Sequence, residues 1–138
     1  MIYNLDTCII IEILRSNKIV CEQLNAATNA NDIIAISQIA YYEVMRGFDL
    51  NLKRAARKQV IFEQIYDEAA HLLLNEKSLY IAAEIYRYLC KRGQKIEDDD
   101  IFIAAITLAN DATLITDNVK HFERVPNLKV VNWKDLGD

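Results

Sequence analysis

The sequence contains little glycine and proline, with 3 Gly and 1 Pro in 138 residues. Long linkers are usually rich in such residues, so long disordered segments are not expected. No apolar run approaches the ~20 residues that a membrane-spanning helix needs, and the first residues lack the basic, apolar and cleavage segments of a signal peptide. The 3 cysteines have no Cys-x-x-Cys spacing and cannot all pair within one chain. We therefore expect reduced thiols in a cytoplasmic protein.

Positive charge is also in the minority, since 16 Lys and Arg stand against 20 Asp and Glu. A protein that coats nucleic acid normally carries a basic face, so the net charge of −4 disfavours that class. The net charge does not exclude an enzyme that binds nucleic acid through a local basic surface. The basic run Lys53–Lys58 is a candidate contact for an RNA backbone. A solvated helix face explains the run equally well. The chain length fits one domain, which we expect to span residues 1–138.

Apolar periodicity predicts short strands separated by helices. Strands are expected at residues 2–5, 33–36, 113–116 and 128–131, while residues 71–74 fit either a strand or a helix end. Helices are expected at residues 8–14, 19–27, 38–47, 52–70, 78–91 and 101–109, with a helical turn at 118–123. Strands that alternate with helices favour a parallel sheet covered on both faces. We therefore predict an α/β fold, a three-layer α/β/α sandwich with a parallel sheet of about four to five strands.

Four acidic residues from distant parts of the chain are predicted to meet at the carboxyl edge of this sheet. Asp6 and Asp117 each follow a predicted strand, Asp100 lies in the first turn of an apolar helix, and Glu43 lies in the helix after the second strand. Strand ends and helix N-termini collect at the same edge of a parallel α/β sheet, and binding sites form there. We therefore expect the four side chains to converge.

Each acid also has a purely structural interpretation. Asp6 and Asp117 can cap helices, and one member of Asp98–Asp100 is expected to cap the helix that follows. Glu43 can pair with Arg46 three residues further on. Because a buried unpaired carboxylate is costly, four unrelated structural acids at one edge are the weaker interpretation.

Carboxylates packed together repel one another, which raises their pKa values, and a divalent cation removes that repulsion. Oxygen ligands without a convincing histidine or cysteine set point to Mg²⁺ or Mn²⁺ rather than zinc. Such a site can lower the pKa of a bound water and stabilise charge on a phosphate. Hydrolysis of phosphodiester bonds is the chemistry that these residues favour.

The segments that carry these acids resemble the PIN domain, specifically VapC-type toxin ribonucleases of bacterial toxin–antitoxin pairs. The resemblance rests on an ordered set of segments: Ile2-Tyr3-Asn4-Leu5-Asp6-Thr7, Ile36-Ser37, Tyr42-Glu43-Val44-Met45-Arg46-Gly47, Asp100-Ile101-Phe102-Ile103-Ala104-Ala105, and Ala112-Thr113-Leu114-Ile115-Thr116-Asp117-Asn118 with Phe122 and Val125-Pro126. Each motif alone is weak, but the set in this order and at these separations is specific. It spans nearly the whole chain, from Ile2 to Trp133.

The resemblance implies endonucleolytic cleavage of RNA with Mg²⁺ or Mn²⁺. It also implies an antitoxin that holds the enzyme inactive with its tail in the acidic groove, and a homodimer. It carries the family's catalytic and metal-binding acids onto Asp6, Glu43, Asp100 and Asp117.

Individual roles follow from the same resemblance. Asp6 and Asp100 are expected to be metal ligands, Glu43 to complete the ligand set or orient the attacking water, and Asp117 to bind a second metal or act through water. Thr7 and Thr116 are expected to add hydroxyl contacts. The neighbours Asp98 and Asp99 leave the third motif ambiguous by a residue. His71 and His121 are interpreted as isolated polar positions rather than general bases.

Two other functions stay open at this point. A phosphatase of the haloacid dehalogenase type also begins with a strand that ends in Asp, but it needs a second Asp two residues later, where this chain has Cys8. A catalytically inactive PIN-like interaction module is expected to have lost one or more of the acids, and none is missing here.

Overall fold

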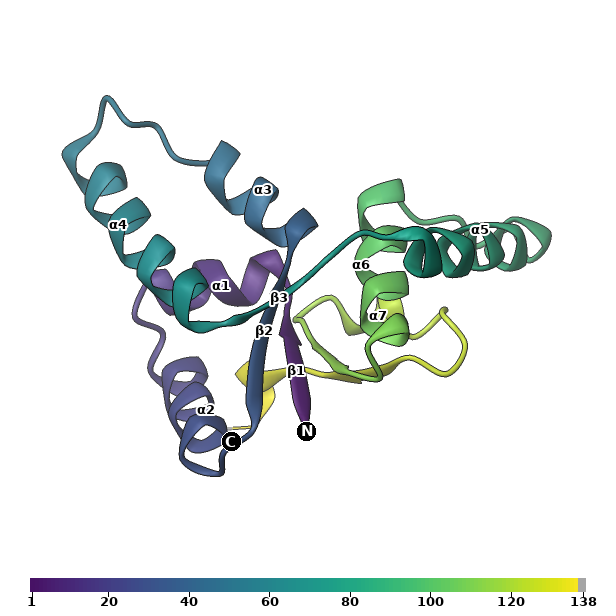
Figure 1. The fold of residues 1–138 in the computed structure, drawn as a ribbon, viewed down its shortest axis with the longest axis horizontal. Coiled ribbons are helices and arrows are strands. Elements are labelled where there is room, and N and C mark those ends of the chain that lie inside the picture. Colours follow the sequence, from purple (N-terminus) through teal and green to yellow (C-terminus); the bar gives the residue numbers. More distant parts are fainter. Residues whose placement is uncertain (137–138) are drawn as a thin grey trace.

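A parallel sheet of five strands lies between two layers of helices in the computed structural model, which describes residues 1–136 (Figure 1). The strands are β1 (Ile2–Leu5), β2 (Ile33–Ser37), β3 (Ala70–Leu72), β4 (Thr113–Ile115) and β5 (Lys129–Val131). The helices are α1 (Thr7–Leu14), α2 (Lys18–Asn29), α3 (Gln38–Arg46), α4 (Lys53–Glu68), α5 (Glu76–Lys91), α6 (Asp98–Ala109) and α7 (Val119–Phe122), followed by the 3₁₀ turn η1 (Trp133–Asp135). The predicted α/β/α architecture is confirmed.

Three local details differ from the expectation or complete it. The ambiguous segment near His71 is a strand, because β3 pairs with β2 and places His71 opposite Ile36. Helix α6 begins at Asp98 rather than at residue 101, with Glu97 as its N-cap residue and no side-chain capping bond. The prediction that one of the three aspartates caps this helix is therefore wrong. They lie inside its first turn, where the helix dipole favours negative charge.

The strand order makes β1 the central strand of the sheet. The order is β3-β2-β1-β4-β5, so the chain first builds the sheet outward from β1 through β2 and β3, and later adds β4 and β5 on the other side. The direction of growth reverses between β1 and β4, where the Asp6 amide donates to the Ile115 carbonyl oxygen at 2.9 Å. In open α/β sheets, ligands bind outside the carboxyl ends of the strands at such a switch point.

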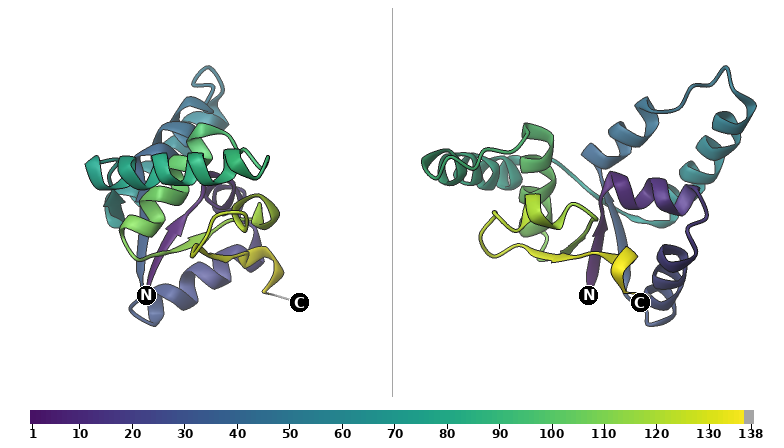
Figure 2. Two further views of the ribbon diagram at one scale, coloured as in Figure 1. Left: turned by 90° about the vertical axis from the view of Figure 1, so that its right-hand side faces the viewer. Right: turned by 180° about the vertical axis from the view of Figure 1, so that it is seen from behind.

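The two helical layers form separate hydrophobic clusters on the two faces of the sheet (Figures 1 and 2). Helices α1 to α4 pack on one face around buried Ile10 and Phe62. Helices α5, α6 and α7 pack on the other face around buried Leu89 and Ile103. Successive side chains of a strand point to opposite faces, and β4 accordingly gives one residue to each cluster.

Helix α6 is fixed to the central strand by a polar contact as well as by apolar packing. The Asn4 side-chain amide donates to Thr107 Oγ1 at 2.9 Å, and Thr107 in turn donates to the Ile103 carbonyl oxygen at 2.7 Å. The buried body of α6 therefore has a set position against β1, which fixes the position of the acids in its first turn. Among residues 1–136, no helix has the length and apolar character needed to span a membrane.

Candidate active site

Asp6 lies directly after β1 and caps helix α1. Its Oδ1 accepts a hydrogen bond from the Thr7 amide at 2.9 Å, and its Oδ2 accepts one from Thr116 Oγ1 at 2.8 Å. The residue is buried, with 7% of its surface exposed. The capping interpretation of Asp6 is thus correct, but one oxygen is also held by a residue 110 positions away. That second bond ties the ends of β1 and β4 together.

Glu43 is carried toward Asp6 by helix α3, which begins at the buried N-cap Ser37. Its Oε1 accepts a hydrogen bond from Thr7 Oγ1 at 2.8 Å. Its Oε2 lies 3.7 Å from Arg46 Nη2, an ion pair whose arginine side chain is 56% exposed. Because an exposed pair of this kind contributes little, the pairing with Arg46 does not by itself account for the position of Glu43. The contact with Thr7 joins it to the Asp6 side of the site.

The other two acids each lie beside a basic side chain. Asp100, in the first turn of α6, has its Oδ2 3.5 Å from His121 Nε2. Asp117 follows β4, and its Oδ2 lies 3.5 Å from Lys134 Nζ on η1. Asp117 does not cap α7, because Asn118 occupies that position and makes no side-chain capping bond. The capping interpretation of Asp117 is therefore wrong.

All four acids border one cleft at the switch point of the sheet. The cleft has a volume of about 560 Å³. It is lined by Asp6, Thr7, Cys8, Ile11, Glu43, Asp100, Asp117 and Asn118. Acids that are more than a hundred positions apart in the chain thus line a single cleft, and Thr7 and Thr116 both contact them. Their catalytic and metal-binding roles stay a prediction.

Three acids of the cleft, Asp6, Glu43 and Asp100, have raised pKa values. Burial raises the pKa of Asp6 above its ordinary value despite the hydrogen bonds that it accepts. Burial, reinforced by a hydrogen bond and the charge of Asp99, raises the pKa of Glu43 to about 7. Burial and the charges of Asp99 and Asp6 raise the pKa of Asp100 to about 6. Removing these carboxylates from water and crowding them together disfavours their charged forms.

Asp99 lies beside the site, whereas Asp98 is exposed on the helix surface. The effect of Asp99 on both Glu43 and Asp100 places its carboxyl within interaction distance of each. Asp100 is the member of the run that lines the cleft. The structure therefore favours Asp100 as the expected acid of the third motif, with Asp99 as an additional negative neighbour.

The donor set of the cleft fits a hard divalent cation. Within residues 1–136, no three His, Cys, Asp or Glu side chains stand in ready-made coordination around a single point. The four acids instead face a common space and offer only oxygen ligands, which Mg²⁺ and Mn²⁺ prefer. The raised pKa values of Asp6, Glu43 and Asp100 are the shifts expected where negative charge is crowded, and a bound cation of charge +2 would offset that charge.

Cys8 borders the same cleft but does not provide a nucleophile. Its Sγ lies 3.7 Å from Asp6 Oδ2 and 3.5 Å from Thr116 Oγ1. Burial and the negative charge of Asp6 raise the pKa of the thiol to about 12. Because the thiolate is the reactive form of cysteine, this thiol stays protonated and inert at neutral pH.

Sequence reasoning missed the basic neighbours of the acids. The interpretation of His121 as an isolated polar position is wrong, since its Nε2 is buried next to Asp100. Lys134 was assigned no role, although its ammonium faces Asp117. No spacing pattern links either pair. The only available signal was the position of His121 four residues after Asp117, within one helical turn of an expected site residue.

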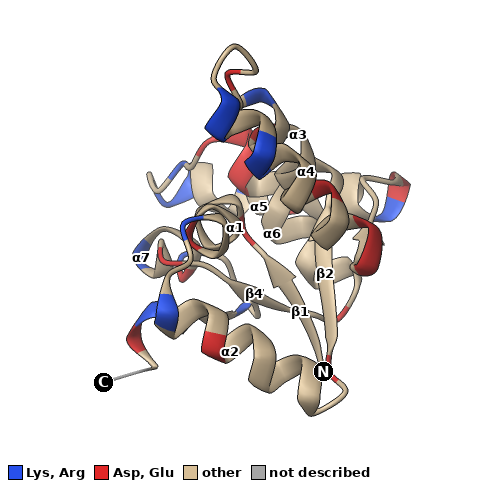
Figure 3. Ribbon diagram, turned by 90° about the vertical axis from the view of Figure 1, so that its left-hand side faces the viewer, with Lys and Arg blue, Asp and Glu red and all other residues tan. Residues whose placement is uncertain are grey.

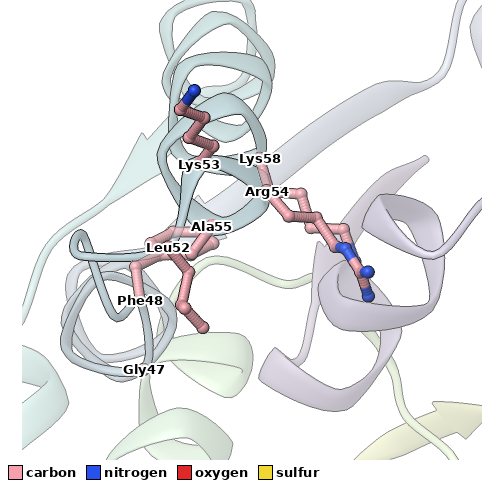
Figure 4. A pocket seen from close by; sticks show the side chains of 7 residues that line it. All are labelled: Gly47, Phe48, Leu52, Lys53, Arg54, Ala55 and Lys58. Atoms are coloured by element: carbon pink, nitrogen blue, oxygen red, sulfur yellow. The ribbon is translucent and has the colours of Figure 1, made fainter.

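Basic residues gather at the start of α4, near the end of α3 (Figure 3). A pocket separate from the acidic cleft lies there, between α3 and α4. This α3–α4 pocket has a volume of about 510 Å³ and is lined by Gly47, Phe48, Leu52, Lys53, Arg54, Ala55 and Lys58. It shares no lining residue with the acidic cleft. Figure 4 shows Lys53 and Arg54 extending in different directions, so their charges do not converge on one point.

Comparison with known proteins finds relatives of this sequence and this fold. The family model described as "PIN domain" matches residues 3–128. Ribonuclease VapC1 of Haemophilus influenzae (strain R2866) is 32% identical over 136 residues, which cover 96% of this chain and 98% of that protein.

Solved structures of related proteins have the same fold. The crystal structure of VapBC2 from Rickettsia felis, bound to a DNA fragment from their promoter, superposes with a TM-score of 0.87 at 29% identity, covering 96% of this chain and 99% of that chain. The structure of VapBC-1 from nontypeable Haemophilus influenzae gives a TM-score of 0.83 at 30% identity, covering 98% of this chain and 100% of that chain. The chain therefore belongs to the PIN-domain family and, within it, to the group of VapC ribonucleases.

Proposed function

We propose that this protein is a metal-dependent endoribonuclease, the toxin of a toxin–antitoxin pair, and that it hydrolyses RNA phosphodiester bonds with Mg²⁺ or Mn²⁺. Asp6, Glu43, Asp100 and Asp117 hold the cation and supply the catalytic groups. The observation that carries the proposal is the convergence of these four acids on one cleft at the switch point of the sheet. The relatives named as ribonucleases support the choice of RNA as substrate.

The side chains of the cleft have different roles in the proposed in-line displacement at phosphorus. Asp6, which is held by Thr7 and Thr116, and Asp100 serve as the fixed anionic ligands. Glu43, whose raised pKa of about 7 suits proton transfer near neutral pH, accepts a proton from the attacking water. Thr7 fixes Glu43 Oε1, and Oε2, whose basic neighbour is the exposed Arg46, is the oxygen proposed to take the proton. When bound, a divalent cation lowers the pKa of water and offsets negative charge on the phosphate.

The proposed partners and setting follow from the relatives. The related structures carry the names of VapBC toxin–antitoxin assemblies, so we propose a cognate antitoxin that covers the acidic cleft. We propose a homodimer as well, a single PIN-like domain over residues 1–138, and a cytoplasmic location.

The decisive experiment measures cleavage of a labelled RNA by the purified protein. We expect cleavage with Mg²⁺ or Mn²⁺ and none in excess chelator, because the acids need a cation to bind phosphate. Asp6→Asn and Asp100→Asn are expected to abolish cleavage while their circular dichroism spectra stay native. RNA cleavage that persists in chelator contradicts the proposal.

Two further assays separate the remaining functions. Hydrolysis of p-nitrophenyl phosphate without RNA cleavage would favour the haloacid dehalogenase chemistry, which the family match already opposes. A folded protein that binds Mn²⁺ but cleaves no RNA would favour the inactive interaction module. Growth arrest on expression, relieved by co-expression of a short neighbouring reading frame, supports the toxin assignment.

A further inference from the structure

The His121 ring lies beside the acidic cleft with one of its nitrogens buried against Asp100. Its Nε2 is fully shielded from solvent and has no hydrogen-bond partner within residues 1–136. The atom points at Asp100, with 3.5 Å between Nε2 and Oδ2. Leaving a buried polar nitrogen without a partner costs about 1–3 kcal/mol. A ring that turned Nε2 toward water would avoid that cost. Another contact must therefore hold the His121 ring in this orientation.

The cause lies on the other side of the ring. His121 Nδ1 is 2.9 Å from the side-chain amide nitrogen of Asn118, one turn earlier. An amide nitrogen donates and does not accept, so Nδ1 must be the accepting nitrogen. The proton of the neutral ring is then on Nε2. Asn118 thus orients the ring so that the N–H group of His121 Nε2 faces Asp100.

Asp100 is also the acid of the site that most needs such a donor. Thr7 and Thr116 hold Asp6 by two hydrogen bonds, and Thr7 holds Glu43 by another. The side chain of Asp100 makes no hydrogen bond within residues 1–136, and the one basic side chain that faces it there is His121. Hydrogen bonds to catalytic groups are often long before a ligand binds and tighten afterwards.

We propose that His121 is a positioning residue for Asp100, with Asn118 fixing the ring so that Nε2–H donates to Oδ2. This contact restrains the carboxylate and leaves Oδ1 as the oxygen available to a cation. The inference rests on the proposed function, since it gives Asp100 the role of a ligand. Partners that orient metal ligands in this way typically change metal affinity by about 10- to 100-fold when they are removed.

Two amide substitutions test the inference with matched chemistry. In His121→Gln the amide nitrogen reaches about as far as Nε2, whereas in His121→Asn it reaches only about as far as Nδ1. We expect His121→Asn to weaken Mn²⁺ binding, measured by isothermal titration calorimetry, by about 10-fold. We expect His121→Gln to retain most of the wild-type affinity. His71→Asn is the matched control, because that ring stacks on Tyr66 away from the cleft.

The results distinguish this inference from the proposed function. Equal Mn²⁺ affinity in wild type and folded His121→Asn overturns the inference alone, and so does equal weakening in the Asn and Gln variants. If the wild type binds no Mn²⁺ and cleaves no RNA, the proposed function and the inference both fail. A second readout needs no metal and no substitution at position 121. Long-range ¹H–¹⁵N NMR of the metal-free protein is expected to show the Nε2–H tautomer, and a neutral ring protonated at Nδ1 contradicts the inference.

Discussion

Burial sets the behaviour of individual acids in this protein. Glu43 has an ordinary pKa of 4.5 and a folded pKa of about 7, chiefly because the cleft removes its carboxyl from water. The folded chain therefore holds this proton more tightly than the unfolded chain does. By linkage, the stability that the protonated group contributes is fully present below pH 4.5 and is lost as the pH rises through 7. The site is a destabilising feature of the metal-free protein at neutral pH.

Replacing Glu43 by Gln is expected to raise the melting temperature of the metal-free protein at pH 8, because the amide has no proton to lose. The gain is expected to shrink toward zero at pH 4.5, where the native carboxyl is itself protonated. Differential scanning calorimetry of chelator-treated protein across this range measures the effect. The exposed acid Glu84 on α5 provides the control substitution Glu84→Gln. A gain that is independent of pH would contradict the assigned cause.

Three of the acids could be located from local markers, since Asp6 and Asp117 follow strands and Asp100 lies in the first turn of a helix. Glu43 lies further along α3 and was singled out as a carboxylate on a largely small and apolar helix stripe. The raised pKa values of Asp6, Glu43 and Asp100 depend chiefly on burial, and only their direction was predictable.

The hydroxyl contact of Thr116 was also expected, from the family resemblance. The basic neighbours were not predictable, because the His121 ring and the Lys134 ammonium reach the acids only through tertiary folding and no spacing rule encodes that approach.

At the scale of elements, helix α6 determines where Asp100 lies. The helix is buried along most of its length and packs most extensively against α5, through residues that include Leu89. Its apolar run made its existence predictable. The residue at which α6 begins was not predictable, because three consecutive aspartates fit an N-cap and a first helical turn equally well. Similarly, the short strand β3 could be identified only through its pairing with β2.

Leu89→Ala is expected to lower the free energy of unfolding by about 2–5 kcal/mol, since the side chain is fully buried between α5 and α6. Urea denaturation of the metal-free protein measures the loss. The control is Tyr80→Ala, because Tyr80 lies on the exposed face of α5, the helix that also carries Leu89. This substitution is expected to change the free energy of unfolding by no more than about 0.5 kcal/mol. Similar losses in both variants would contradict the packing described for α6.

At the scale of the whole molecule, an acidic enzyme must attract a polyanion. The net charge of −4 is unfavourable for RNA binding, and the cleft itself is acidic. Local basic surface has to compensate, and the start of α4 is one such region. The fold and the family were predictable at this scale because the ordered motifs span the chain. The separation of the α3–α4 pocket from the cleft was not, because sequence distance says little about distance across the surface.

If the basic run contacts backbone phosphates and not the reacting atoms, the variant Lys53→Gln/Arg54→Gln is expected to raise KM for RNA without changing kcat. The same two substitutions are also made in the inactive Asp6→Asn protein. There the slope of log K for RNA binding against log salt concentration is expected to become less steep by about 1. Fluorescence anisotropy across a salt series measures both effects. Lys18→Gln/Lys77→Gln removes the same charge from α2 and α5. Identical behaviour of the two double variants would show that only net charge matters.

The most direct test locates the cation itself. In a crystal of the protein soaked with Mn²⁺, anomalous diffraction is predicted to give a peak in the cleft at the carboxyl ends of β1 and β4, with oxygens of both Asp6 and Asp100 bound to the ion directly or through one water molecule. A cleft without a peak, or a peak that the two aspartates cannot share, would contradict the claim that these distant acids form a single metal site.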